Sequence, residues 1–188
     1  MCNEFGYDQR LFYEPCSTYI EHEMLKVRDD FPEKLKDSDR IQMIKIVIEK
    51  ADQFISGYLE VFESTESKAF LDDRIKITWN YRIFEIEKSF SAFISHLIST
   101  RFNQYDLDKM IQTIVRFYLY LADKCKFDKV YEESFARLFI SNRNCYEEFD
   151  CQVIAAIRKV NSDFMHNYET YKEALQSSNV ISDEYKQY

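Results

Sequence analysis

Glycine and proline are almost absent from this chain, which holds two of each in 188 residues. Tight turns between β-strands depend on these two residue types, because glycine adopts positive φ and proline fixes φ. Their scarcity excludes collagen, glycine-rich phosphate-binding loops and most turn-rich all-β folds. Aromatic residues form 16% of the chain and apolar residues 46%, which excludes wholesale disorder. The sequence therefore predicts a soluble, all-α protein.

The clearest helical pattern is an apolar stripe through residues 41–62. Its members recur at alternating spacings of three and four, which places them on one face of an α-helix. They are Ile41, Ile44, Ile48, Ala51, Ile55, Tyr58 and Phe62. Asp37 or Ser38 can cap the start of this helix.

Further apolar stripes predict helices at 15–29, 74–99, 107–121, 128–139 and 149–171. Polar residues 64–74 are expected to connect two helices. Within residues 74–84, apolar residues also alternate with polar ones as they do in a β-strand, so a β-hairpin is the alternative for this segment. The predicted fold is an irregular bundle of five or six helices, a single domain over 1–176, with a short polar C-terminal tail at 177–188.

A set of apolar residues from these stripes is predicted to form the core. Its members are Ile44, Ile48, Ile55, Trp79, Ile86, Phe90, Phe93, Ile114, Leu121, Phe139, Val153 and Ile157. Because large side chains in a packed core are costly to truncate, we expect these positions to dominate the stability of the domain.

Motifs for catalysis, cofactors and metals are missing from the sequence. Three histidines limit any metal or acid–base site, and two glycines cannot build a P-loop or a dinucleotide-binding loop. The nearest approach to a di-iron spacing is a single Asp163-x-x-His166. We therefore expect no catalytic residues, no cofactor and no metal, so the protein is not expected to be an enzyme.

Charge and cysteine content narrow the partners and the compartment. The net charge is −8, from 25 Lys plus Arg and 33 Asp plus Glu, so we expect no binding to bulk duplex nucleic acid. Five cysteines form no paired framework, and the first twenty residues carry charges where a signal peptide needs an apolar run. No stretch is long enough for a membrane span. A cytoplasmic location is the expectation.

Small basic clusters beside aromatic or amide side chains are candidates for partner binding. Lys124 and Lys126 adjoin Phe127, and Arg143 lies between two asparagines. Cations next to rings can meet phosphates while the rings stack on bases. The same pattern also describes long side chains at the edge of a core, and the cations around Trp79 have the same two interpretations.

The C-terminal tail supplies two further candidates, Tyr185 and Tyr188. We expect this tail to insert into a pocket of a partner assembly with these two rings leading, and the alternative is a tail that packs on its own domain. The functional hypothesis is a non-catalytic binding or regulatory protein that docks on a larger protein or ribonucleoprotein assembly, such as the ribosome.

An alternative hypothesis is a helical groove protein that captures an amphipathic partner helix, as Bcl-2-like proteins do. Residues 131–139 (YEESFARLF) resemble a helix of some poxviral Bcl-2-like proteins. The resemblance covers nine residues and implies no site residue for this chain.

Overall fold

The structure is a computed structural model that describes residues 13–32, 34–61, 65–83, 85–100, 107–141 and 147–173. Every regular element in these ranges is a helix, so the all-α prediction is confirmed. In chain order the elements are α1 (Tyr13–Asp29), α2 (Asp37–Val61), α3 (Thr65–Arg82), α4 (Ile86–Ser99), α5 (Leu107–Tyr120), α6 (Lys124–Ser141) and α7 (Glu147–Arg158). Residues 168–173 add a short helical segment after α7.

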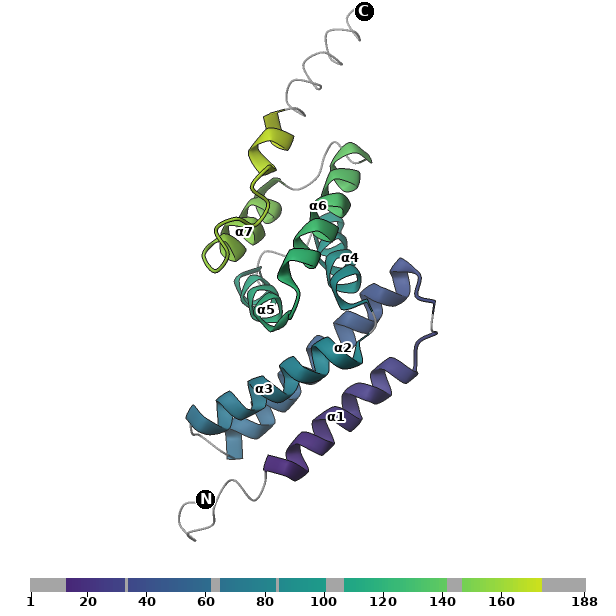
Figure 1. Cartoon of the computed structure of the whole chain (residues 1–188), viewed down its shortest axis with the longest axis vertical. Helices are drawn as coiled ribbons and strands as arrows, with labels where there is room; N and C mark the ends of the chain where they lie inside the picture. Colours follow the sequence, from purple (N-terminus) through teal and green to yellow (C-terminus); the bar gives the residue numbers. More distant parts are fainter. Residues whose placement is uncertain are drawn as a thin grey trace, which may run out of the picture.

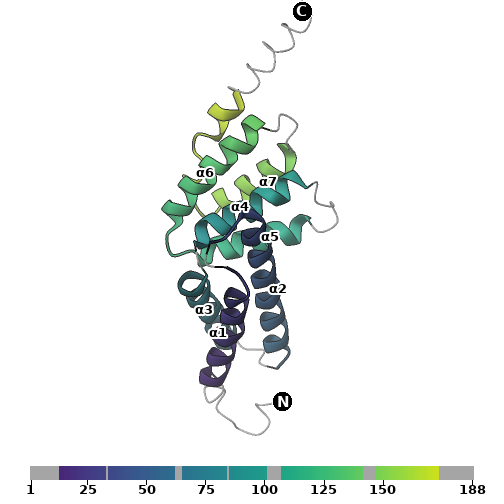
Figure 2. The same cartoon turned by 90° about the vertical axis from the view of Figure 1, so that its right-hand side faces the viewer.

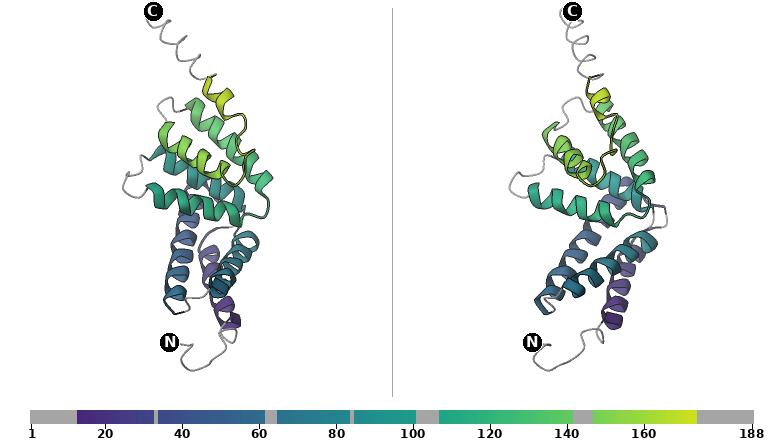
Figure 3. Two further views of the ribbon diagram at one scale, coloured as in Figure 1. Left: turned by 90° about the vertical axis from the view of Figure 1, so that its left-hand side faces the viewer. Right: turned by 60° about the vertical axis from the view of Figure 1, so that its left-hand side comes forward.

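The helices form an elongated molecule with two ends (Figure 1). Helices α1, α2 and α3 pack together at one end, whereas α4, α5, α6 and α7 make up the other. Helix α2 belongs to both ends, because it packs against α1 and α3 and also makes extensive contact with α4 (Figure 2). Helix α4 also packs along α6, and α5 and α7 lie side by side (Figure 3).

One hydrophobic core runs through both ends of the molecule. Most of the predicted core residues are buried in it, namely Ile44, Ile48, Trp79, Ile86, Phe90, Phe93, Ile114, Leu121, Val153 and Ile157. Ile55 is half-buried and packs against this core. The side chain of Phe139 lies outside the described residues.

Aromatic rings form a continuous chain of contacts from α3 into the end of the molecule that α4, α5, α6 and α7 make up. The Trp79 ring meets Phe117 at 4.5 Å and Phe90 at 5.6 Å between centroids. Phe90 then contacts Phe127 at 5.4 Å, and Phe127 contacts Tyr131 at 5.6 Å. Edge-to-face and offset pairs of this kind stabilise a core beyond their buried area. Much of the aromatic content therefore serves the interior.

A side-chain amide joins α3 to the connection after α5. Asn80 donates from Nδ2 to the main-chain oxygen of Tyr120 at 2.6 Å, and its Oδ1 accepts from the main-chain N–H of Ala122 at 2.7 Å. The Tyr120 hydroxyl in turn donates to Asp72 of α3 at 2.5 Å. These bonds satisfy backbone groups at the end of α5 and fix the two ends of the molecule to each other.

The helix predicted over 74–99 is two helices, and the prediction of a polar connection at 64–74 is wrong. Residues 65–82 form α3, so the hairpin alternative for 74–84 is wrong too. The polar residues at the start of α3 include Lys68, which is on the exposed side of this helix.

The break before α4 lies at Glu85. The φ of 45° and ψ of 47° at this residue are left-handed and cannot continue a right-handed helix.

The helix predicted over 149–171 is also interrupted. Helix α7 ends at Arg158, and helical structure resumes at residue 168. Arg158 turns back over the intervening residues and donates to the carbonyls of Phe164 and Met165 at 2.9 and 2.6 Å. Met165 has a φ of 52°, again outside the helical region. The two breaks make the described helices more numerous than the five or six expected.

The predicted start of α6 is wrong because a neighbouring carboxylate is the cap. Asp123 accepts from the main-chain N–H of Lys126 at 2.8 Å, so α6 begins at Lys124 rather than at Asp128. Helix α2 begins at Asp37, close to the predicted start, and Asp39 in its first turn accepts the main-chain N–H of Lys36 at 3.1 Å. None of the helices formed by the described residues combines the length and apolar character that crossing a bilayer requires.

Candidate functional site

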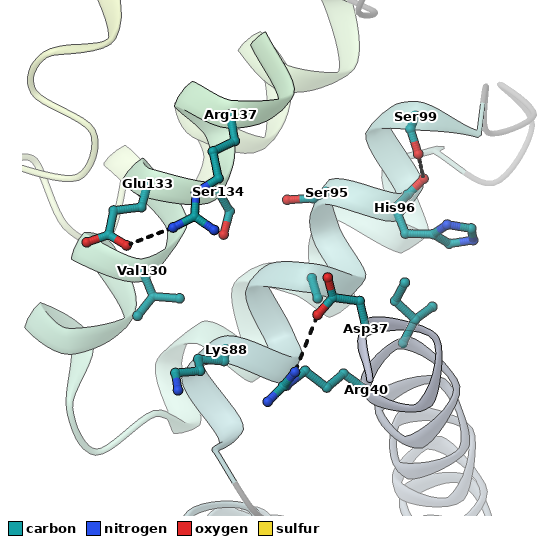
Figure 4. Close-up of a pocket in the computed structure, with 12 residues that line it drawn as sticks. Asp37, Arg40, Lys88, Ser95, His96, Ser99, Val130, Glu133, Ser134 and Arg137 are labelled. Carbon is teal, nitrogen blue, oxygen red and sulfur yellow. Dashed lines mark hydrogen bonds and ion pairs between the residues drawn. The ribbon is translucent and has the colours of Figure 1, made fainter. Parts of the chain in front are cut away.

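A cavity of about 610 Å³ opens between the start of α2 and the facing sides of α4 and α6 (Figure 4). We name it the α2–α4–α6 groove. Its lining comes from Asp37, Arg40 and Ile41 of α2, from Lys88, Ala92, Ser95, His96 and Ser99 of α4, and from Val130, Glu133, Ser134 and Arg137 of α6. The volume lies within the roughly 300–1,000 Å³ that is usual for ligand-binding clefts.

The groove exists because one face of α4 carries small side chains. Ala92, Ser95 and Ser99 follow one another at spacings of three and four, so they share a face of the helix. The opposite side of α4 carries large apolar residues such as Phe90 and Phe93, which are buried in the core. Alanine and serine cannot fill the space between α4 and its neighbours, and the space stays open to solvent.

Two cations lie at the end of the groove where α4 begins, and both are paired with carboxylates, Arg40 with Asp37 at 3.3 Å among them. Arg40 of α2 and Lys88 of α4 lie at this end (Figure 4). Both bind the carboxylate of Glu85, Lys88 at 2.5 Å and Arg40 through a second ion pair. Hydrogen bonds from Lys88 and Arg40 hold the pKa of Glu85 below its usual value. Arg40 also donates to the carbonyl of Leu35 at 2.9 Å, which fixes its position.

The α6 side of the groove carries an exposed ion pair. Arg137 and Glu133 are 3.6 Å apart, and their side chains are 80% and 71% exposed. A pair this open to solvent is worth roughly 0–1 kcal/mol, so both groups can exchange partners at little cost. Ser95 points from α4 toward α6, and its Oγ is buried without a hydrogen-bond partner in the described part of the chain (Figure 4).

Lys124 and Lys126, predicted to bind a partner, lie outside the groove and make contacts within the chain. Lys124 donates to the carbonyl of Leu121 at 2.9 Å and lies 5.9 Å from the centre of the Tyr118 ring. Lys126 donates to Glu87 at 2.9 Å, and this bond raises its pKa. Lys124 therefore covers the carbonyl end of α5, and Lys126 ties α6 to α4.

The other predicted binding residues, Arg143, Tyr185 and Tyr188, lie outside the described residues, as does the tail at 177–188. Trp79 is fully buried, so stacking on a nucleic-acid base is excluded for this ring.

The sequence analysis did not predict the groove. The feature of the sequence that accompanies it is the set of small residues on one face of α4. That pattern also occurs on ordinary solvent-exposed helix faces.

The lining of the groove includes one histidine and three serines. Ser99, three residues after His96, donates its hydroxyl to the main-chain oxygen of His96 at 2.8 Å. Within the described ranges, no three His, Cys, Asp or Glu side chains come together to hold a metal ion. Cys16, Cys125 and Cys151 are free thiols, and Cys151 shares a hydrogen bond of 3.0 Å with Tyr168.

Neither the protein-family models nor the curated proteins or solved structures contain a match to this chain. The class of protein rests on the fold and the site: an all-α protein with a polar groove between three helices.

Proposed function

We propose that this is a non-catalytic binding protein that holds a segment of a partner protein in the α2–α4–α6 groove and thereby docks on a larger assembly. The observation that supports the proposal is the groove itself. It has walls from three helices and a floor of small side chains, and it lies beside the hydrophobic core.

The dimensions of the groove suit a helical segment. Lys88 and Ser99 mark its extent along α4, about 16 Å or three helical turns at roughly 1.5 Å per residue. Small residues on the floor let a partner backbone approach closely. Helix-in-groove recognition uses such a surface, with anchors spaced three and four residues apart on the partner.

The character of the lining separates two kinds of helical partner. Three lining residues are apolar (Ile41, Ala92 and Val130), whereas the other nine are polar or charged. A groove for a strongly apolar helix, as in the Bcl-2-like alternative, needs mostly hydrophobic walls. The lining therefore favours a partner with a narrow apolar stripe and charged flanks. Mixed charges also favour a protein over RNA, because RNA contacts rely on excess cations.

Photocrosslinking from inside the groove tests this function. A photoreactive amino acid replaces Glu133, and the matched control carries it at Lys109, an exposed residue of α5 outside the groove. In extracts of the native cells, we expect protein adducts of defined mass from position 133 that are absent from position 109. A bulky second substitution, Ser99→Trp or Ala92→Trp, should abolish them by filling the groove.

Adducts that persist in both blocked variants, or that contain nucleic acid instead of protein, would contradict the proposal. Ser99 is exposed at the end of α4, so Ser99→Trp tests the groove even if Ala92→Trp disturbs folding. Helix content by circular dichroism checks each variant before the crosslinking.

A further inference from the structure

We infer that this chain associates with a second copy of itself by domain swapping, in which α3 and α4 straighten into one continuous helix and the two copies exchange α4–α7. The inference goes beyond the proposed function and does not depend on what the groove holds. Three features support it: the backbone at the break between α3 and α4, the apolar stripe that crosses the break, and the contacts between the two ends of the molecule.

The backbone is strained at the break between α3 and α4. Glu85 has a φ of 45° and a ψ of 47°, a left-handed conformation that is unfavourable for a residue with a Cβ atom. The Glu85 side chain makes no hydrogen bond that caps the start of α4. An unbroken helix would remove the left-handed residue and give the first N–H groups of α4 the carbonyls of the preceding turn. Straightening therefore favours the backbone at this point.

Two ion pairs hold Glu85 in its left-handed conformation. Its carboxylate pairs with Arg40 of α2 and, at 2.5 Å, with Lys88 of α4. The side chains of Glu85 and Lys88 are 44% and 53% exposed, so water weakens their pair. The pair with Arg40 requires that α2 and α4 lie together. The break is therefore maintained by the packing of α2 on α4, and a second copy can supply that packing.

The sequence on both sides of the break suits one long helix. Residues 65–99 contain no glycine and no proline, so no residue type enforces the break. Apolar side chains recur across it at spacings of three and four, as on one face of an uninterrupted helix. All of them are buried, namely Ile75, Trp79, Ile83, Ile86, Phe90, Phe93 and Leu97.

The contacts between the two ends of the molecule can form equally well between two copies. Helix α2 packs on α4 and α3 packs on α5 (Figure 1), and the Trp79 ring meets Phe90 at 5.6 Å. In a straight helix these two rings are about 16 Å apart along the axis, at roughly 1.5 Å per residue, so their contact requires a second copy. Straightening without a partner would expose Ile44 and Val47, which are buried.

An exchanged dimer therefore buries the core of the monomer and differs from it chiefly at the break. Each α2–α4–α6 groove of the dimer takes α2 from one copy and α4 and α6 from the other. The dimer gains the relaxed backbone at two copies of Glu85, whereas the monomer is favoured by dilution.

A matched pair of substitutions at the break tests the inference. Glu85→Gly and Glu85→Ala both remove the carboxylate, but glycine accepts the left-handed φ whereas alanine favours a helix. Sedimentation equilibrium of the full chain, from low micromolar to near-millimolar concentration, measures the association. We expect the parent to dimerise at the upper concentrations, and Glu85→Ala to have a dimer dissociation constant about tenfold or more below that of Glu85→Gly. Glycine and alanine at Lys129, an exposed position of α6, should leave the dissociation constant unchanged.

A second measurement distinguishes exchange from association side by side. Asp52 of α2 and Arg116 of α5 form an ion pair between the two ends of the molecule. The variants Asp52→Arg and Arg116→Asp each bring like charges together at this pair. In an exchanged heterodimer of the two variants, both pairs again join opposite charges. After the variants are refolded together from urea, native mass spectrometry should find heterodimers in excess of the one half that random pairing gives.

Glu133→Arg and Arg137→Glu provide the control mixture, because both residues lie on α6 and move together in the exchange. These two variants should pair at random. A parent chain that stays monomeric at every concentration, equal dissociation constants for Glu85→Gly and Glu85→Ala, or random pairing of Asp52→Arg with Arg116→Asp would each overturn the inference. None of these results bears on the proposed function, which the crosslinks from position 133 test separately.

Discussion

At the scale of single residues, Arg158 holds the turn that follows α7. Its guanidinium binds two successive carbonyls, those of Phe164 and Met165, and so closes the turn between α7 and the helical segment at 168–173. Met165 is buried and has positive φ, a conformation that costs a non-glycine residue about 1–3 kcal/mol. The turn persists because the bonds from Arg158 offset this cost.

Replacing Arg158 with alanine should therefore destabilise the protein by about 2–4 kcal/mol, the loss of two charge-assisted hydrogen bonds to carbonyls. Urea unfolding followed by circular dichroism measures the change. Lys159→Ala, at the adjacent exposed position, should stay within about 0.5 kcal/mol of the parent. An equal loss in the two variants would show that the turn is not held by Arg158.

At the scale of elements, Phe127 of α6 joins helices that are distant in sequence. Its ring contacts Phe90 of α4, Tyr118 of α5 and Phe164 of the turn after α7, at centroid distances of 5.4, 5.6 and 6.2 Å. The side chain is fully buried. A ring in this position determines how α4, α5 and α6 pack together, and so the spacing of the groove walls.

The variant Phe127→Ala should lose about 3–5 kcal/mol of unfolding free energy, because it leaves a cavity where several rings meet. Thermal and urea unfolding give the value. Tyr81→Ala, which removes a ring that is 78% exposed on α3, is the control and should change stability by less than about 0.5 kcal/mol. A similar cost for the two would mean that the ring contacts do not hold the elements together.

The sequence predicted the buried face of each element better than its ends. Periodicity identified Ile44, Ile48, Phe90 and Phe93 as core residues, since burial is a property that spacing records. It failed at Glu85, because Arg40 and Lys88 hold that left-handed residue and no pattern in the sequence indicates those contacts. The groove was unpredictable for the same reason: its three walls come from helices separated along the chain.

At the scale of the whole molecule, buried tyrosines set the response to alkaline pH. Burial raises the pKa of Tyr118 to about 12 and raises the pKa of Tyr120, Tyr131 and Tyr168 as well. In the unfolded chain, a tyrosine loses its proton near pH ~10. Between that pH and the higher folded values, the unfolded state binds fewer protons than the folded state, so stability falls as pH rises.

We expect the protein to keep this stability below about pH 10 and to lose it progressively above, with unfolding coupled to ionisation of the buried phenols. Phenolate absorbance and helical circular dichroism, recorded across the same alkaline titration, test the coupling. The late part of the absorbance rise should coincide with the loss of helix. Complete tyrosine ionisation in a chain that remains helical would contradict this expectation.

The position of α2 in both ends of the molecule limits how the chain can be divided. A cut between α3 and α4 looks natural from the two groups of helices, yet it separates α2 from α4, its most extensive contact. The remaining fragment would expose Ile44 and Val47 to water, and the other fragment would lose the support beneath Phe90 and Ile94. Either half would therefore be prone to aggregate, and loss of binding by a fragment would say nothing about which half carries the site.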